Sequence, residues 1–357
     1  MTPSDSSSPT AFTSSPHAVP RRRVAIPADA PDDALFRREW LVCNGLGGYA
    51  SGTIGGAPTR RYHGYLIAAL ANPAGRMMML NSLVQRVRLP DGTRADLGWV
   101  GPTFVAGQPV MRIERRIPLV GFELELGLPV WRYAGLGVAI ERRIVVSYSQ
   151  NTVVIVYRLL EGGRIRLELR PALQFRGHDD PVSTAVPEAY PLHAMGAKIE
   201  LAAPAPLPPL RLHLSGERTS FVVEPMAVHD IAYATEESRG YASRGQLYSP
   251  GRFRAAIAPG GEVALVASTE AWETILPISA REAIAAETQR RHRLLDAAPP
   301  AARQGPAAEL VLAADQFVIR PAGRHEDHVR ARIAGDEAWT VIAGYHWFTD
   351  WGRDTMI

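Results

Sequence analysis

The stretch WFTDWGRDTMI (347–357) gathers side chains that could bind a sugar. Aromatic faces cover the C–H side of a pyranose ring, and charged groups form paired hydrogen bonds with adjacent hydroxyls. A buried arginine–aspartate pair with the tryptophans in a core would use the same residues, so the stretch alone leaves both interpretations open. The candidate sugar-binding residues are Trp347, Asp350, Trp351, Arg353 and Asp354.

A second polar stretch, TRRYHGYLIAA (59–69), precedes an apolar run. It carries no G-x-S-x-G turn for a hydrolase nucleophile, and His63 has no partner at metal-ligand spacing. We therefore expect a structural hydrogen-bonding histidine, with the lining of a sugar site as the alternative. The possible structural or site-lining residues are Arg60, Arg61, Tyr62 and His63. No metal or organic cofactor is predicted.

Three further motifs favour plain structural interpretations. NGLGGYASGTIGG (44–56) matches G-x-G-x-x-A, but a dinucleotide site also needs a following helix and an acidic residue about 20 positions later, and no acid stands between Trp40 and Pro90. A tight chain path that only glycine permits is the better explanation. HDD (178–180) and HEDH (325–328) lie in polar connections and are predicted to be solvated turns rather than metal sites.

The composition excludes several classes of protein. The formal net charge of the 357 residues is only +3, and the arginines are dispersed, which argues against nucleic acid as a partner. Cys43 is the sole cysteine, as expected in a reducing compartment. No apolar run reaches the ~20 residues that a membrane span needs. These features predict a cytoplasmic protein with no membrane partner.

Most of the chain has the period-two pattern of β-strands. In RIRLELR (164–170) the apolar residues alternate with charged ones, and short Gly-rich turns separate many such runs. This pattern predicts an antiparallel β-sandwich or barrel. Near residue 278 it changes: Ser279 and Glu282 form an S-x-x-E capping box, and a helix free of Gly and Pro follows. A second helix over 307–319 carries an apolar stripe at helical spacing and is expected to be buried at the start of another domain.

Four motifs in order resemble the bacterial and archaeal glycogen debranching enzyme family, the amylo-α-1,6-glucosidase type. They are EWLVCNGLGGYASGTIGGAPTRRYHGYLIA (39–68), ESRGYASRGQLYSPGRF (237–253), LAADQFVI (312–319) and GYHWFTDWGRDTMI (344–357). The resemblance implies a mainly β fold, in which an antiparallel β-sandwich domain is followed by a linker helix and the first elements of an (α/α)6 barrel. The expected divisions are 1–32 (disordered tail), 33–277 (sandwich), 278–305 (linker helix and connection) and 306–357 (start of the barrel).

By that likeness Arg353 and Asp354 would bind sugar hydroxyls, while Trp347, Asp350 and Trp351 would line the pocket. His346 stands where the family usually has proline, a departure that would alter this turn. The resemblance implies glycogen or another α-glucan as substrate and hydrolysis of α-1,6-linked branch-point glucose, with glucanotransferase activity left open. Inverting glycosidases need two carboxyls about 6.5–9.5 Å apart. The family's pair is expected downstream of Ile357, so this chain alone is expected to be inactive.

Two other functions remain open from the sequence. A glucoamylase-like or trehalase-like α-glucosidase would share the barrel type. A glucan-binding β-sandwich without activity would instead present an exposed aromatic ring, with Trp40, Trp99, Trp131 and the tyrosines as candidates.

Overall fold

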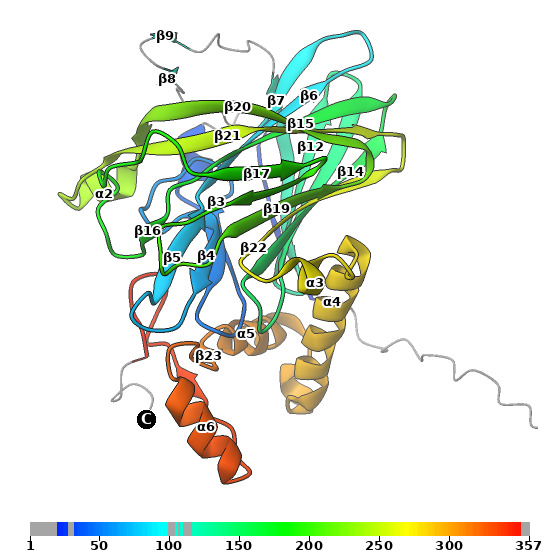
Figure 1. The fold of residues 1–357 in the computed structure, drawn as a ribbon. Coiled ribbons are helices and arrows are strands. Elements are labelled where there is room, and N and C mark those ends of the chain that lie inside the picture. The colour runs from blue at the N-terminus through cyan, green and yellow to red at the C-terminus, as the bar shows by residue number, and fades with distance from the viewer. Residues whose placement is uncertain (1–19, 28–31, 99–103, 106–107, 110–115, 351–357) are drawn as a thin grey trace, which may run out of the picture.

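The computed structural model describes residues 20–27, 32–98, 104–105, 108–109 and 116–350. Three sheets of mostly antiparallel strands form the body of the molecule, and the helices after residue 278 lie at its lower end in Figure 1. The mainly β fold with an antiparallel N-terminal sandwich is confirmed. The helices are α1 (Asp32–Phe36), α2 (Ala234–Ser238), α3 (Trp272–Ile275), α4 (Ala280–Ala297), α5 (Gly305–Asp315) and α6 (His325–Ile333), with a 3-10 turn at Pro300–Ala302.

The two large sheets pack against each other. In spatial order, the nine-stranded sheet contains β1 (Arg21–Val24), β11 (Leu119–Glu125), β12 (Leu128–Gly135), β13 (Val138–Val146), β14 (Thr152–Glu161), β22 (Glu262–Ser268), β19 (Leu210–Ser215), β18 (Lys198–Leu201) and β17 (Leu192–Met195). The eight-stranded sheet contains β10 (Arg116–Ile117), β7 (Arg94–Leu97), β6 (Ser82–Arg88), β15 (Ile165–Ala172), β21 (Arg244–Ile257), β20 (Glu217–Ala232), β8 (Phe104–Val105) and β9 (Gln108–Pro109).

A third, five-stranded sheet carries the residues of interest. Its order is β16 (Arg176–Gly177), β5 (Arg76–Leu80), β4 (Gly64–Ala69), β3 (Tyr49–Thr53) and β2 (Glu39–Cys43). A small ribbon of β23 (Val318–Ile319) and β24 (Thr340–Val341) follows α5. Among the described residues, no helix is long and apolar enough to cross a membrane.

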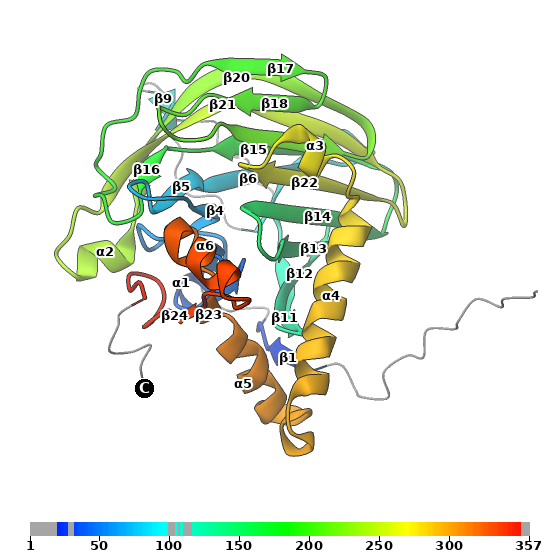
Figure 2. The ribbon, with the colours of Figure 1, turned by 60° about the horizontal axis from the view of Figure 1, so that its bottom comes forward.

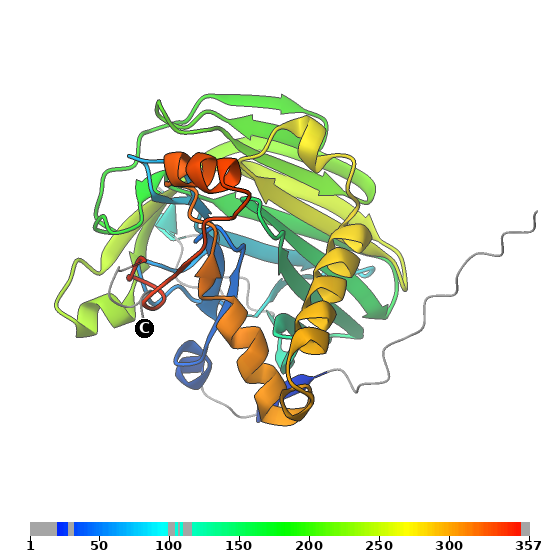
Figure 3. The same cartoon turned by 90° about the horizontal axis from the view of Figure 1, so that it is seen from below.

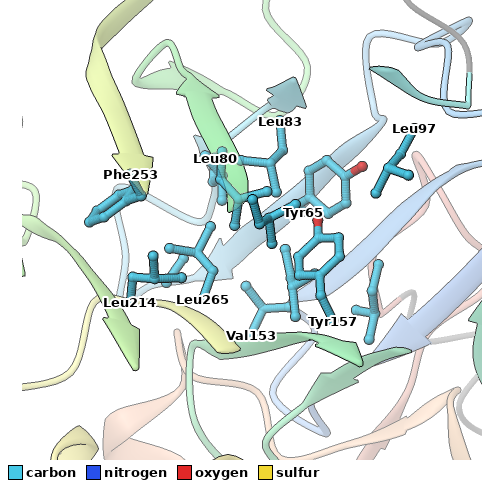
Figure 4. Close-up of a cluster of buried hydrophobic side chains, with 14 of the residues drawn as sticks. Tyr65, Leu80, Leu83, Leu97, Val153, Tyr157, Leu214, Phe253 and Leu265 are labelled. Atoms are coloured by element: carbon cyan, nitrogen blue, oxygen red, sulfur yellow. The ribbon is translucent and has the colours of Figure 1, made fainter. Parts of the chain in front are cut away.

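The alternation read from the sequence decides which side chains are buried. In β15, Ile165, Leu167 and Leu169 point into the core, whereas Arg166 stays exposed. Burying one face of each sheet removes apolar surface from water, at roughly 25 cal/mol per Å². Figure 4 shows the resulting cluster, where Tyr65 and Tyr157 lie among leucines from several strands.

One charged side chain is built into this core. Arg142 is 1% exposed, and its guanidinium lies 3.8 Å from the ring centroid of Trp131. It also donates to Gln85 Oε1 at 3.0 Å, so a hydrogen bond and an aromatic face offset part of the cost of burying this charge. Trp131 in turn meets Trp40 edge-on at 5.2 Å. Through Gln85 and Trp40, these contacts connect the nine-stranded sheet to the other two sheets.

The N-terminal edge differs from the predicted disordered tail over 1–32. Residues 1–19 and 28–31 lie outside the described part, but Arg21–Val24 form β1 and pair antiparallel with β11. Arg21 and Arg23 form ion pairs with Glu125 and Glu123, at 3.3 and 3.2 Å. The segment has few apolar residues to bury, so cross-strand ion pairs stabilise its pairing with β11.

The predicted capping box and helix after residue 278 are confirmed. Ser279 caps α4 together with Glu282, and α4 runs beside β13 and β14 (Figure 2). Glu287 pairs with buried Arg291 at 2.7 Å, and Arg291 also donates to the carbonyl of Leu126 at 2.8 Å. The helix is therefore fixed to the sandwich by a buried, hydrogen-bonded charge.

The second helix is shorter and less buried than predicted. It ends at Asp315, and its buried residues are Ala308 and Leu312, whereas Leu310 is 71% exposed. An (α/α)6 barrel is not evident in the described part of the chain, where only α5 and α6 follow the linker helix. Of the predicted stripe, Val311 packs with Leu294 and Leu295 of α4, whereas Leu310 stays in water.

Candidate functional site

The segment before position 351 lies against one face of the five-stranded sheet, where Tyr345 packs on Cys43, Tyr49, Ile67 and Met78. Figures 2 and 3 show this segment beside the sheet. The Gly-rich stretch between β2 and β3 is a tight turn, in which Asn44 Oδ1 accepts from the amides of Leu46 and Gly48, each at 2.9 Å. A Cβ on Gly48 would lie 2.7 Å from the carbonyl oxygen of Ile67. Only glycine fits, which confirms the structural interpretation of this stretch.

Arg76, at the start of β5, binds the backbone of residues 344–350, which carry Trp347 and are called the fastened segment below. Its guanidinium donates to the carbonyl of His346 at 2.7 Å and to the carbonyl of Phe348. Tyr345 donates its hydroxyl to the carbonyl of Gln316 at 3.0 Å. The backbone is held on both sides of Trp347, whose side chain remains 38% exposed. The sheet thus presents this ring without covering it.

His346 is the buried anchor of the same segment. Its Nε2 lies 2.8 Å from Ser51 Oγ, and the Ser51 hydroxyl donates to the carbonyl of Trp40 at 2.8 Å. Ser51 therefore accepts from His346, which places the imidazole proton on Nε2. Burial, with the neighbouring His63, lowers the pKa of His346 to about 3. The neutral ring fills the position where the resemblance led us to expect a proline.

The predicted sugar-binding residues are placed in part. Trp347 and Asp350 lie on the fastened segment, and Asp350 Oδ2 pairs with Arg324 at 2.5 Å. This pair orients the carboxylate and occupies one of its oxygens. Trp351, Arg353 and Asp354 lie outside the described residues, so their predicted roles stay predictions.

The residues from Arg60 to His63 hold the loop before β4. Arg60 Nε donates to Glu39 Oε1 at 2.6 Å, and His63 Nδ1 accepts from the amide of Thr59 at 3.1 Å. Arg61 donates to the carbonyl of Asp179 at 3.0 Å. The contacts of His63 agree with a structural hydrogen-bonding role.

Tyr62 belongs to the same loop and faces the fastened segment. It is 2% exposed, and its ring lies stacked near His346 at 6.0 Å and tilted against Trp347 at 6.2 Å. Burial raises the pKa of its hydroxyl above the ordinary value. Tyr62 therefore supports Trp347 from the side of the sandwich.

Three possible metal ligands meet between the sheet and the segment. Ligand atoms of Glu39, His63 and His346 lie within 4.8 Å of one another, a grouping that sequence spacing could not reveal. Because His63 Nδ1 accepts from the backbone, its proton sits on Nε2, which lies 3.5 Å from Glu39 Oε1. A metal-binding histidine instead donates its other ring N–H and keeps a lone pair for the metal. The arrangement favours a polar contact over a metal site.

The pKa values of all three groups in this cluster are lowered, for different physical reasons. Burial alone would raise the pKa of Glu39, but hydrogen bonds and charges from His63 and Arg60 lower it to about 2. Burial lowers the pKa of His63, against the opposing influence of Glu39. At neutral pH the cluster therefore holds one carboxylate and two neutral imidazoles.

Two motifs predicted to be solvated turns are organised differently. His178 is buried, with its Nε2 2.9 Å from the Tyr49 hydroxyl, although Asp179 and Asp180 are exposed as expected. The rings of Tyr49 in β3 and Tyr62 in the loop before β4 lie against this histidine, which its own polar sequence context could not indicate. HEDH (325–328) begins helix α6, because Glu326 and Asp327 favour a helix N-terminus.

Several residues of this site escaped sequence analysis. Arg76 and Glu39 are the first residues of β5 and β2, and nothing in their spacing marks a site. Arg239 and Tyr241 follow α2 and reach Trp347 and Arg61, and only their place in the motif at 237–253 could have drawn attention to them. Long-range contacts of this kind become visible only in the fold.

Comparison with known families agrees with this arrangement. The family model described as glycogen debranching enzyme N terminal matches residues 38–264, and the model described as amylo-alpha-1,6-glucosidase matches residues 312–357. The chain belongs to the glycogen debranching enzyme family. The first match covers the sandwich of this debranching-family chain, and the second covers the segment that carries Trp347. A search of curated proteins found no match.

Some solved structures match parts of the chain at low sequence identity. A putative kojibiose phosphorylase from the human microbiome is 9% identical, with a TM-score of 0.36, and the match covers 84% of this chain and 38% of that one. A bacterial glucoamylase complexed with acarbose is 8% identical, with a TM-score of 0.30 and coverages of 78% and 41%. A heparan sulfate lyase from Pedobacter heparinus is 14% identical, with a TM-score of 0.25 and coverages of 39% and 19%. The debranching-family chain spans less than half of each.

Proposed function

We propose that this chain provides the sandwich and the first sugar-binding loop of a cytoplasmic glycogen debranching hydrolase that cleaves α-1,6-linked glucose at branch points. The observation that carries the proposal is the fastened segment: Arg76 holds the backbone on both sides of Trp347, and the ring stays partly exposed. The family match supports an α-glucan as substrate. The domain division at 33–277, 278–305 and 306–357 is part of the same proposal.

In this proposal the segment binds the sugar and does not cleave it. Asp350 forms an ion pair with Arg324, which holds it on the segment proposed to bind sugar. The general acid and the general base are proposed to lie beyond residue 357, where one protonates the bridging oxygen and the other activates water on the opposite face. Trp347 and Asp350, with Trp351, Arg353 and Asp354, would hold the terminal glucose in register. We propose no metal or organic cofactor for this chemistry.

A glucan-binding sandwich without activity is the alternative from a different class. Two of its candidate aromatic residues do not suit it, since Trp40 is 5% and Trp131 0% exposed. Trp99 lies outside the described residues. Burial favours a structural role for these two tryptophans, whereas Tyr241, one of the candidate tyrosines, is 50% exposed.

The test begins with the reading frame after codon 357. If the frame continues, the extended protein should release glucose from phosphorylase limit dextrin, while this chain alone should release none. Preference for maltose or trehalose over limit dextrin would instead indicate a glucoamylase-like or trehalase-like enzyme. Absence of hydrolysis from every α-glucan by the extended protein would refute the proposed function.

A further inference from the structure

An alternating row of aromatic rings and arginines lies beside Trp347. The guanidinium of Arg61 is 5.0 Å from the ring centroids of both Tyr62 and Tyr241. The guanidinium of Arg239 is 5.3 Å from the Tyr241 ring and 4.9 Å from the Trp347 ring. The row therefore joins the loop before β4, the turn after α2 and the fastened segment, which lie near one another in Figures 2 and 3.

The turn after α2 is fixed by its own hydrogen bonds. The amides of Arg239 and Tyr241 donate to the carbonyl of Glu236 at 3.1 and 3.0 Å. The Glu236 side chain is fully buried, and its Oε1 accepts from the amide of Arg61 at 3.2 Å. The turn and the 60–63 loop are thus joined through one buried carboxylate.

The outer end of the row remains open to solvent. Tyr241 is 50% and Trp347 38% exposed, and Arg239 is exposed as well. In the described part of the chain, no carboxylate lies within ion-pair distance of Arg239. A guanidinium that stacks on aromatic rings keeps its N–H edge free to donate. Two adjacent hydroxyls of a sugar match that edge, and the rings beside it suit the C–H face of the sugar.

We infer that Arg239 and Tyr241 form the part of the glucan-binding site that the sandwich contributes. Arg239 donates to neighbouring hydroxyls of a glucosyl residue, while Tyr241 and Trp347 supply the apolar surface. This inference rests on the proposed function and adds to it two binding residues from outside the barrel match. The ligand class is a neutral glucan, because the site offers donors and ring faces, and the α-1,4 linkage follows from the proposed function.

The test measures binding of maltoheptaose to this chain by titration calorimetry. Arg239→Lys keeps the charge but loses the planar fork, and Tyr241→Leu removes the ring. Each should weaken binding by about tenfold, the loss of roughly one charge-assisted hydrogen bond or one ring contact. Arg293→Lys, an exposed arginine on α4 with no ring contact, is the matched control and should bind as the unaltered chain does.

A purely structural role for Arg239 gives a different result. If Arg239 only steadied Trp347, Arg239→Lys without sugar would raise amide exchange over 344–350, and that result would overturn the inference. Equal affinity of Arg239→Lys, Tyr241→Leu and unaltered chains would also overturn it, as would no binding by the unaltered chain at millimolar sugar. The limit-dextrin assay on the extended protein decides the proposed function separately, so the two failures can be told apart.

Discussion

The sandwich and the segment from residue 305 to 350 are held by different forces. In the sandwich, side chains as large as Trp131 and Tyr157 are completely buried. In the later segment, Leu310 is 71% and Ile333 83% exposed, and much of its attachment is polar. Arg76 donates to two of its carbonyls, and Arg290 forms a two-pronged pair with Asp315 at 3.0 and 2.7 Å.

This contrast indicates that different interactions determine the stability of the domain and the position of the fastened segment. Apolar burial is strong but has no direction, whereas a hydrogen bond fixes the position of its partner. The sandwich therefore supplies the free energy of folding, and a few arginines on its edge supply the geometry of the site. A change in the core should affect the whole domain, and a change at the edge should affect the fastened segment.

The largest effect is expected in the core. Trp131→Ala removes a buried ring, the face under Arg142 and the donor to the carbonyl of Ile54 at 2.9 Å. We expect a loss of about 3–5 kcal/mol in the free energy of unfolding, the usual cost of such a truncation. Denaturant unfolding followed by circular dichroism measures it. A loss below about 1 kcal/mol would contradict the view that the sandwich core dominates stability.

The next effect is local. Arg76→Met keeps the length of the side chain but removes its donors to the carbonyls of His346 and Phe348. Hydrogen bonds from charged groups contribute about 1.5–3 kcal/mol, so the fastened segment should lose protection from amide exchange by that amount while the sandwich strands keep theirs. Arg88→Met, on the exposed end of β6, is the control. If amide exchange over 344–350 were unchanged in Arg76→Met, Arg76 would not be what holds the fastened segment in position.

The sequence predicted the sandwich well because its evidence is local. Alternation in β15 and the capping box at Ser279 depend on residues a few positions apart, and both predictions are confirmed. The strand at Arg21–Val24 escaped prediction because its charges are satisfied by Glu123 and Glu125, about a hundred residues away. Charge read along the chain could not anticipate that pairing.

The candidate site was predictable only in part for the same reason. Trp347 and Asp350 form a recognisable local motif, but the residues that hold them come from other strands. His63 had no ligand-spaced partner in sequence, yet Glu39 and His346 lie beside it in space. Arg76 resembles any other arginine at the start of a strand.

The pH dependence of stability tests the cluster of Glu39, His63 and His346, where the fastened segment meets the sandwich. The pKa of His346 is about 6.5 in the unfolded chain and is lowered to about 3 by burial. As the pH falls below 6.5 the unfolded chain takes up a proton that the folded chain refuses, so stability is lost progressively down to about pH 3. Between pH 7 and pH 5 we expect a loss of ~1–2 kcal/mol.

A matched variant tests whether His346 causes this loss. His346→Gln keeps an N–H near Ser51 but cannot titrate, so its stability should fall less between pH 7 and pH 5. His63 and His178, whose pKa values are also lowered by burial, account for the remaining slope. Thermal unfolding at both pH values measures the difference. An equal slope in both proteins would assign the titration to other groups.

The smallest effect should come from the exposed apolar residues of the helices. Leu310→Gln on α5 and Ile333→Gln on α6 change side chains that are largely in water already, so each should shift the free energy of unfolding by less than about 0.5 kcal/mol. The same changes should reduce self-association measured by sedimentation velocity, because exposed apolar surface favours contact between copies. A loss of 2 kcal/mol or more, on the scale of a core truncation, would show that these residues are buried in solution. The contrast between a buried sandwich and a segment placed by polar contacts would then fail.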